Sequence, residues 1–218
     1  MQLTRVKMLL ILALVMAFPL SILATEPATS PHAGDDQFKQ ATVPLAWSFP
    51  RDHGRHDGFK TEWWYFTGNL ADEAGRKFGY QLTFFRTSLI PTAASRPSAW
   101  AMHDLYFAHA AISDIAEQKF VFKDHLSRGR AGLAESSDQK MDVRLLDWTA
   151  TMDDGKIHLS ARDAQFSIEL QCQDGRGPIL QGPGGINAKG REPGQASYYY
   201  SMTRLKTAGT LTLAGKQL

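Results

Sequence analysis

The sequence predicts an all-β protein in which antiparallel strands form a barrel or a sandwich. Short extended runs recur along the chain, turn residues such as Gly, Asn and Asp separate them, and no segment of comparable length shows a helical period. Many short strands at near-even spacing, joined by hairpin-like turns, are typical of these two architectures. With 218 residues, the chain suffices for one large domain, or for one domain and part of another.

Residues 1–24 are predicted to be an export signal. Arg5 and Lys7 form a basic start, and an apolar run extends from Met8 to Leu23 before a plausible cleavage point. The run is short for a membrane span. We therefore expect cleavage, transfer to the bacterial periplasm or the medium, and no stable membrane span afterwards. Residues 25–37 are small, polar and proline-containing, which indicates a flexible arm.

The predicted mature chain is about neutral. Removing Arg5 and Lys7 from the 24 basic residues leaves 22, against 22 acidic residues. Since the sequence contains no basic run, we expect no nucleic-acid partner. Cys172 is the single cysteine, so no internal disulfide can form, and its place in an alternating run predicts a core thiol.

From residue 38 onward the expected strands follow one another with turn residues between them. Each alternates apolar and polar side chains or is rich in aromatic and β-branched residues. They cover 61–70, 77–85, 104–113, 118–125, 142–152, 156–161 and 164–173. The last of these is the clearest, because four apolar side chains from Phe166 to Cys172 alternate with three polar ones.

The stretch TEWWYF, residues 61–66, has large side chains on both faces of its strand. Trp63 and Tyr65 point one way, whereas Glu62, Trp64 and Phe66 point the other. This pattern favours a closed barrel, whose interior receives one face while a neighbouring element or second domain covers the other. We expect one tryptophan to line a cavity and the other to lie beneath that neighbour.

The C-terminal part of the sequence departs from the strand pattern. After a first domain at 38–181, residues 182–196 are rich in Gly and Pro, as in a linker or a crossing loop. Residues 197–218 then start new extended chain. They either complete the first barrel or begin a second domain that is incomplete. In the second case, an unfinished strand edge would promote association.

Several stretches resemble the family of carotenoid 1,2-hydratases (hydroxyneurosporene synthases) and AttH proteins, many labelled predicted secreted hydrolases. The resemblance runs from about Trp47 to the end and rests on FPRDHGRHDGFKTEWWYFTGNL, RKFGYQLTFFRTSL, LYFAHAAISD, LQGPGGINAKG and ASYYYSMTRL. It implies two tandem lipocalin-like β-barrels, with the second incomplete here. Family members continue with an Asp-x-Glu-Trp segment that holds an acidic catalytic residue of the hydratases. No segment here corresponds to it, so the sequence leaves open whether this chain is an enzyme.

The chemistry that the resemblance implies can be compared with the residues present. Hydration of an isoprenoid double bond needs an acid to protonate the alkene and water to capture the carbocation, which aromatic faces can stabilise. The aromatic residues expected to bind such a ligand are Trp63, Trp64, Tyr65, Phe84 and Phe107. The alternative is that these side chains simply fill a barrel core.

Glu62 and His109 are the candidate catalytic residues. A buried, protonated Glu62 could act as a general acid. The alternative is a strand-end carboxylate that accepts hydrogen bonds from the preceding loop. His109 alternates with Leu105 and Phe107 on an apparently apolar face, where it is either a core histidine or a proton carrier in a cavity.

The cluster RDHGRHDG offers a metal interpretation, in which His53 and His56 join Asp57 or Glu62. Its spacing matches no recognised metal signature, and the glycines at 54 and 58 indicate a loop. We therefore expect structural or hydrogen-bonding roles, with no metal and no other cofactor. Neither the Gly-x-Ser-x-Gly motif of α/β-hydrolases nor a phosphate-binding Gly-Lys-Ser/Thr motif is present.

Two functions of different classes remain. One is a hydratase or hydrolase acting on a hydrophobic, isoprenoid or lipid-like small molecule. The other is a non-catalytic lipid-binding or carrier module that serves an ABC exporter, a partner that the AttH resemblance implies by analogy. An acidic side chain directed into the cavity would favour the enzyme, and a wholly apolar cavity would favour the carrier.

Overall fold

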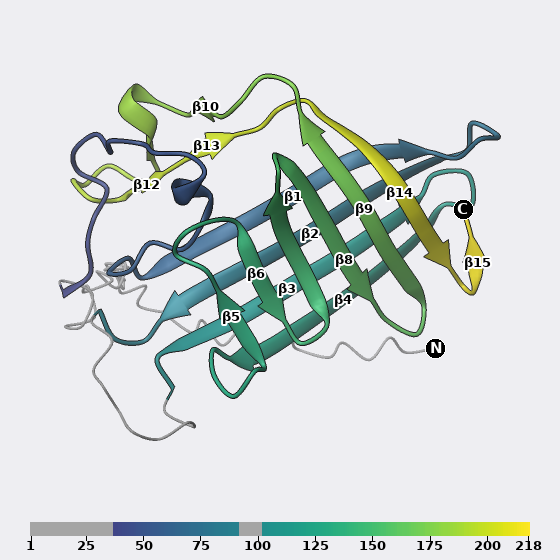
Figure 1. Cartoon of the computed structure of the whole chain (residues 1–218), viewed down its shortest axis with the longest axis horizontal. Helices are drawn as coiled ribbons and strands as arrows, with labels where there is room; N and C mark the ends of the chain where they lie inside the picture. Colours follow the sequence, from purple (N-terminus) through teal and green to yellow (C-terminus); the bar gives the residue numbers. More distant parts are fainter. Residues whose placement is uncertain (1–36, 92–101) are drawn as a thin grey trace, which may run out of the picture.

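The computed structural model describes residues 37–91 and 102–218, in which nearly all regular structure is β-strand (Figure 1). This confirms the predicted all-β, antiparallel class. The predicted export signal at 1–24, and all but the last residue of the arm at 25–37, lie outside the described residues. Within the described ranges, no helix has the length and apolar character needed to cross a membrane.

The first sheet is a four-stranded meander. It consists of β1 (Thr61–Ala71), β2 (Lys77–Ser88), β3 (Asp104–Asp114) and β4 (Lys119–Arg128), paired in chain order and all antiparallel. Short turns join β1 to β2 and β3 to β4, whereas residues 89–103 separate β2 from β3. Alternate residues of each strand face inward, so a single register decides which side chains are buried.

The second sheet contains seven antiparallel strands in the order β15-β14-β9-β8-β7-β6-β5. Their bounds are β5 (Ala134–Ser136), β6 (Asp142–Leu145), β7 (Trp148–Asp153), β8 (Lys156–Arg162), β9 (Phe166–Asp174), β14 (Leu205–Leu213) and β15 (Lys216–Gln217). All neighbours in this sheet also follow one another in the chain, except β9 and β14, which a long excursion of the chain separates.

That excursion forms two short strand pairs at one end of the molecule. Strand β10 (Ile179–Leu180) pairs with β13 (Tyr200–Ser201), and β11 (Ile186–Ala188) pairs with β12 (Ala196–Tyr198). Figure 1 shows both pairs beside the N-terminal described segment, at the upper left. Residues that are far apart in the sequence therefore meet there.

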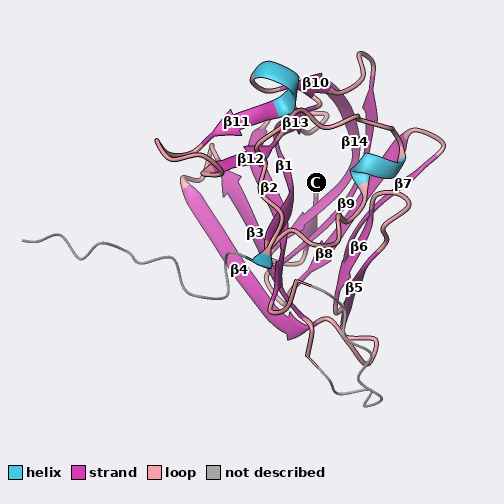
Figure 2. Ribbon diagram, turned by 90° about the vertical axis from the view of Figure 1, so that its left-hand side faces the viewer, coloured by secondary structure: helices cyan, strands magenta, loops and turns pink. Residues whose placement is uncertain are grey.

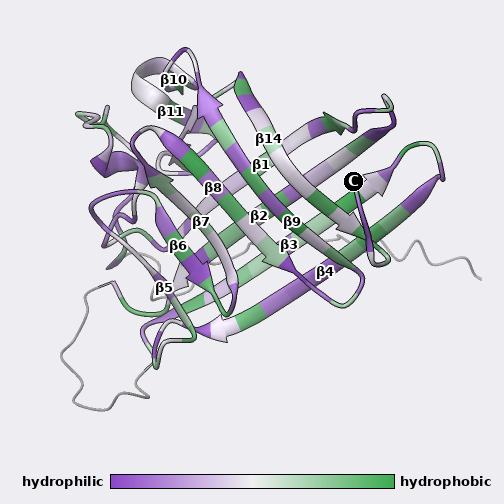
Figure 3. Ribbon diagram, turned by 45° about the vertical axis from the view of Figure 1, so that its right-hand side comes forward, coloured by the Kyte–Doolittle hydropathy of each residue, from purple (hydrophilic) through white to green (hydrophobic). Residues whose placement is uncertain are grey.

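The core lies between the two sheets, which face each other (Figures 1 and 2). Trp148, Phe84, Leu82, Ile157 and Ile168 are among its fully buried side chains. Hydropathy alternates along many strands, as expected when one face of each sheet is buried (Figure 3). Cys172 is also fully buried, with its Sγ atom 3.9 Å from the Tyr80 hydroxyl, and this confirms the predicted core thiol.

The predicted closed barrel is not what the described residues form. Backbone pairing does not join the two sheets. Strands β1 and β4 end the first sheet; the second ends at β5 on one side and, on the other, at β14, which the short β15 covers only at Thr212 and Leu213. The strands of the two sheets cross obliquely (Figure 1). Backbone groups on two crossing edges cannot align over more than a short distance, so the arrangement is a sandwich of twisted sheets rather than a continuous barrel.

The final residues of the chain belong to the second sheet. Strand β14 pairs with β9 over nine residues, from Leu205 opposite Asp174 to Leu213 opposite Phe166. In the structure, this part of residues 197–218 therefore extends the second sheet. The domain boundaries at 181 and 197 stay predictions. Pairing with β9 satisfies the backbone groups on one side of β14. The unfinished edge expected from the sequence is therefore limited to the other side of this strand.

The outer face of the four-stranded sheet exposes several apolar side chains. Phe120, Phe122 and Leu126 of β4 are 67%, 47% and 61% exposed. In the same face, Trp63, Phe85, Phe107 and Leu126 form one row of register partners. The second face of TEWWYF thus continues into an aromatic surface that spans all four strands.

Candidate ligand cavity

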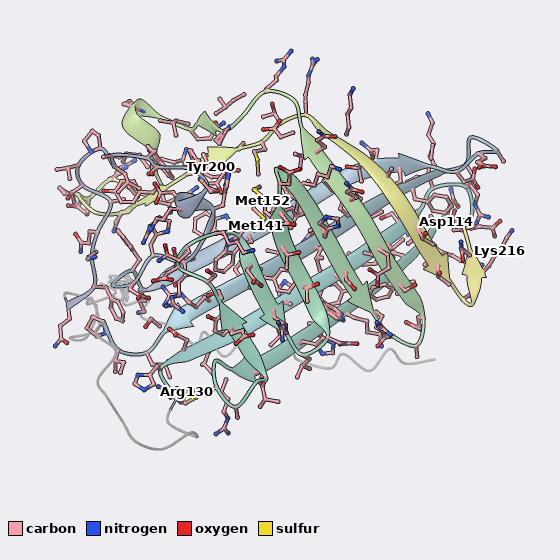
Figure 4. All side chains as sticks on the ribbon, viewed as in Figure 1. Asp114, Arg130, Met141, Met152, Tyr200 and Lys216 are labelled. Atoms are coloured by element: carbon pink, nitrogen blue, oxygen red, sulfur yellow. The ribbon has the colours of Figure 1, made fainter. Side chains whose placement is uncertain are left out.

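A cavity of about 520 Å³ lies beside the edge of β1 that has no paired strand in the described part of the chain. Its walls come mainly from three parts of the sequence, which are residues of β1, the segment that precedes β1, and residues 194–202 with the start of β14; Met141 adds to them. Tyr200 and Met141, which both line it, are labelled in Figure 4. The cavity therefore exists only because the excursion before β14 returns to the N-terminal segment.

Edge-to-face aromatic contacts hold these distant segments together. The ring centroid of Trp47 is 6.1 Å from that of Tyr198 and 5.6 Å from that of Tyr200, with nearly perpendicular planes. Phe49 meets Tyr200 in the same manner at 5.1 Å. Such pairs add to the energy of apolar burial. Gly185 has a φ of +81°, and a Cβ atom there would lie 2.7 Å from the Trp47 ring, so this contact requires glycine.

A chain of charged groups closes one end of the space between the sheets. Arg86, only 2% exposed, donates from Nη2 to Glu62 Oε2 at 2.7 Å and from Nη1 to Asp104 Oδ1 at 2.9 Å. Glu62 Oε1 lies 2.9 Å from His56 Nδ1, and His56 Nε2 lies 3.1 Å from Asp52 Oδ1. Both ring nitrogens of His56 thus face carboxylates. Five charged or titratable side chains from the loop and from three strands form one hydrogen-bonded array.

Asp52 anchors this array to the loop before β1. Burial opposes ionisation of its carboxyl group, but hydrogen bonds from the Ser48 N–H, Arg51 and His56 outweigh this effect and lower the pKa of Asp52. The Ser48 N–H donates to Oδ2 at 2.6 Å. The carboxylate therefore fixes the turn Arg51–His53 and keeps His56 in place.

The geometry of Glu62 matches the structural interpretation of this residue. Its Oε1 atom accepts the backbone N–H of His56, in the preceding loop, at 2.8 Å, and its Oε2 atom accepts two guanidinium N–H groups of Arg86. A protonated carboxyl group would have to give up one of these bonds. Although Glu62 lines the cavity, both of its oxygens are occupied, and its role as a general acid stays a prediction.

A second polar pair lies in the cavity wall. His53 is 5% exposed, and its Nδ1 atom is 2.8 Å from the Tyr200 hydroxyl. The His53 carbonyl accepts the indole N–H of Trp64 at 2.9 Å. Burial lowers the pKa of His53, although the charges of Asp52 and Asp174 act in the opposite direction. Burial, together with the charge of Asp52, raises the pKa of Tyr200.

These shifts predict a stability profile with losses on both sides of neutral pH. The neutral form of His53 stabilises the fold fully above its ordinary pKa of 6.5, and this contribution falls as the pH drops below that value. Tyr200 and Tyr80, whose pKa values burial raises above 10.0, contribute below pH 10 and lose that contribution as the pH rises further. Urea denaturation at several pH values should therefore give the greatest unfolding free energy between about pH 7 and 10. A profile that is flat from pH 5 to pH 11 would contradict the burial of these groups.

Four of the predicted site residues line the cavity, namely Glu62, Trp63, Trp64 and Tyr65. The two tryptophans face opposite ways, as predicted: Trp64 is 7% exposed within the core, while the Trp63 ring lies 6.3 Å from that of Tyr199 outside it. Both nevertheless border the cavity, because it wraps around the edge of β1.

The other three predicted residues do not line this cavity. Phe84 is fully buried between the sheets. Phe107 and His109 lie on the outer face of the four-stranded sheet, because Tyr106 and Ala108 occupy the inward positions of β3. The His109 ring lies between those of Phe85 and Phe122, at 5.4 and 5.7 Å. Ligand binding by Phe107 and catalysis by His109, as predicted from the sequence, would therefore take place at the outer face and not in this cavity.

The residues of the metal interpretation have separate partners. His53 contacts Tyr200, His56 lies between two carboxylates, and Asp57 accepts a hydrogen bond from Arg55 Nε at 2.7 Å. Within residues 37–91 and 102–218, no three His, Cys, Asp or Glu side chains are grouped to hold a metal ion.

Sequence reasoning missed Trp47, Tyr198 and Tyr200 as cavity residues, and Arg86 as the centre of the charged array. The SYYYS block was available as a signal, since three consecutive tyrosines cannot all face a core. Arg86 was also visible as a charge in an otherwise aromatic strand. That Arg86 lies opposite Glu62 could be recognised only once the pairing of β1 with β2 was known.

The fold and the site define a class of protein: a two-sheet antiparallel β-protein with an aromatic cavity at one sheet edge. The family model described as AttH-like matches residues 40–218, and the chain therefore belongs to the AttH-like family. A similar solved structure is that of a provisionally designated AttH protein from Nitrosomonas europaea, with a TM-score of 0.69 and 33% identity. The match covers 81% of this chain and 53% of that one, so this chain spans about half the length of that protein. A search of curated proteins gives no significant match.

Proposed function

We propose that this protein binds a hydrophobic small molecule, isoprenoid or lipid-like, in the cavity beside β1. The observation that carries this proposal is a cavity of about 520 Å³ whose aromatic walls come from three separate segments. That volume lies within the range of small-molecule sites, which are mostly apolar with a few placed polar groups. Binding as an exported protein is consistent with the apolar N-terminal run, and an ABC exporter is the partner that the family suggests.

The binding role fits the polar groups better than catalysis does. An acidic side chain does border the cavity, which is the feature that would favour a hydratase or hydrolase. Both oxygens of Glu62 are, however, occupied by Arg86 and His56, so alkene protonation would require breaking a hydrogen bond of a buried array. We infer that any hydratase or hydrolase activity depends on a second, lipocalin-like half of the kind that the resemblance implies.

Binding can be tested with N-phenyl-1-naphthylamine, an uncharged fluorophore that brightens in apolar sites. Trp63→Ala removes a cavity wall at a half-buried position and is expected to weaken binding about tenfold, through the loss of aromatic contact area. Phe120→Ala is the matched control, because it removes an exposed aromatic side chain of the same sheet outside the cavity. Absence of binding, or a loss confined to Phe120→Ala, would contradict the proposal.

Catalysis is tested separately, with an acyclic carotenoid precursor in detergent. We expect no hydrated product from this chain. Sustained product formation that Glu62→Gln abolishes would replace the binding role by an enzymatic one located in the described cavity.

A further inference from the structure

The cavity wall contains a buried histidine that has a hydrogen-bond partner for only one of its two ring nitrogens. His53 is 95% buried, and Tyr200 occupies its Nδ1 atom at 2.8 Å. Its Nε2 atom forms no hydrogen bond with any residue in 37–91 or 102–218. Unlike both ring nitrogens of His103, Nε2 of His53 is not among the fully buried unpaired atoms, so it keeps some accessible surface although the residue as a whole is buried. Because His53 lines the cavity, a ligand atom there can take the place of water at Nε2.

The tautomer of His53 follows from the hydrogen bonding of Tyr200. Among the described residues, His53 Nδ1 is the only hydrogen-bond partner of the Tyr200 hydroxyl. A phenol O–H is a good donor and a neutral imidazole nitrogen a good acceptor, so we assign the donor role to Tyr200 and the acceptor role to Nδ1. The neutral ring then carries its own proton on Nε2. The group presented to the cavity is consequently an N–H donor.

The charges around His53 restrict the ligand further. Asp52 and Asp174 both act on the imidazole electrostatically, and the guanidinium of Arg51, two residues before His53, is paired with Asp52 at 2.8 Å. A ligand carboxylate at Nε2 would therefore meet two negative charges and lose its own hydration. A neutral oxygen, such as a carbonyl, ether or hydroxyl, can accept the N–H without that repulsion.

We propose that His53 is the specificity-determining residue of the cavity: its Nε2–H donates to a neutral oxygen of an otherwise apolar ligand, and Tyr200 is the positioning residue that fixes this tautomer. This inference rests on the proposed binding function and deepens it. It defines the ligand class as long-chain or isoprenoid molecules that carry an uncharged oxygen, in preference to hydrocarbons and to fatty-acid anions.

The test is displacement of N-phenyl-1-naphthylamine by three twelve-carbon competitors: 2-dodecanone, n-dodecane and dodecanoate. Wild-type protein should prefer the ketone over the alkane about tenfold, as one satisfied hydrogen bond in a buried site would give. His53→Phe should abolish this preference while the alkane still displaces the fluorophore. His158→Phe, a histidine exposed on β8 away from the cavity, should keep the preference.

Nitrogen-15 NMR of the imidazole rings provides a readout that does not depend on variants of His53. The wild-type His53 signals should show the Nε2–H tautomer, and 2-dodecanone should shift Nε2 more than Nδ1. Tyr200→Phe should mix the tautomers and reduce the ketone preference, which a merely structural loss would not do.

The outcomes separate the two proposals. If none of the competitors displaces the fluorophore and the fluorophore itself does not bind, the binding function fails. If ketone and alkane bind equally, if dodecanoate binds most tightly, or if His53 carries its proton on Nδ1, the binding function stands and the role of His53 is overturned.

Discussion

Replacement of Arg86 by methionine is expected to lower the free energy of unfolding by about 3–5 kcal/mol. The guanidinium is 2% exposed and pairs with Glu62 and Asp104, while Nη2 also donates to the carbonyls of His56 and Phe59 at 3.1 Å. Its removal leaves two largely buried carboxylates without a counter-charge. Such an effect is a large part of the total stability of an ordinary domain, and urea denaturation of the purified variant measures it.

The control for Arg86→Met is Arg162→Met. Arg162 is 66% exposed and 3.5 Å from Asp147, an arrangement that contributes at most about 1 kcal/mol. In addition, Glu62→Gln introduced into the Arg86→Met protein should restore part of the stability, since one of the unpaired charges is then absent. A loss below about 1 kcal/mol for Arg86→Met would show that the array is hydrated rather than buried.

Substitution of Gly209 by alanine is expected to destabilise the protein by about 2–4 kcal/mol, from backbone strain and overpacking together. Gly209 lies in the middle of β14 with a φ of +151°, and a Cβ atom would come within 2.1 Å of the Glu169 carbonyl oxygen in β9. The two strands would have to separate there. Thermal unfolding, monitored by circular dichroism, would show the loss as a lower midpoint.

Gly215→Ala provides the matched comparison in the neighbouring turn. Gly215 also has a positive φ, of +78°, but nothing lies within 4 Å of the added Cβ atom, so only about 1–2 kcal/mol of left-handed strain is expected. Equal effects of the two substitutions would mean that β14 does not pack against β9 as described.

The strands were predictable from the sequence because their signal is local. Alternation from Phe166 to Cys172 predicted β9, and the aromatic TEWWYF stretch predicted β1, since a period of two residues is read from neighbouring positions. Closure into a barrel was not predictable in this way. It depends on how the edges β1 and β14, more than 130 residues apart, are oriented relative to each other.

The candidate site, too, was predictable only where its residues give a local signal in the sequence. Residues of β1 were found because aromatic side chains on both faces of one strand are unusual. The face of β3 was misassigned, since Leu105, Phe107 and His109 alternate as plausibly as the set that is actually buried, Tyr106 and Ala108. The His53–Tyr200 pair spans 147 residues, and only the three-dimensional structure brings its members together.

The strand order has a consequence for synthesis on the ribosome. Strands β2 to β4 pair with their immediate predecessors, as do β6 to β9, so each can join its sheet soon after it is made. The segment containing Trp47 is different, because its aromatic partners Tyr198 and Tyr200 are translated about 150 residues later. The nascent chain can thus assemble most of its hydrogen-bonded framework before it has a cavity. Ligand capture has to wait until residues 198–200 have been made and have reached the N-terminal segment.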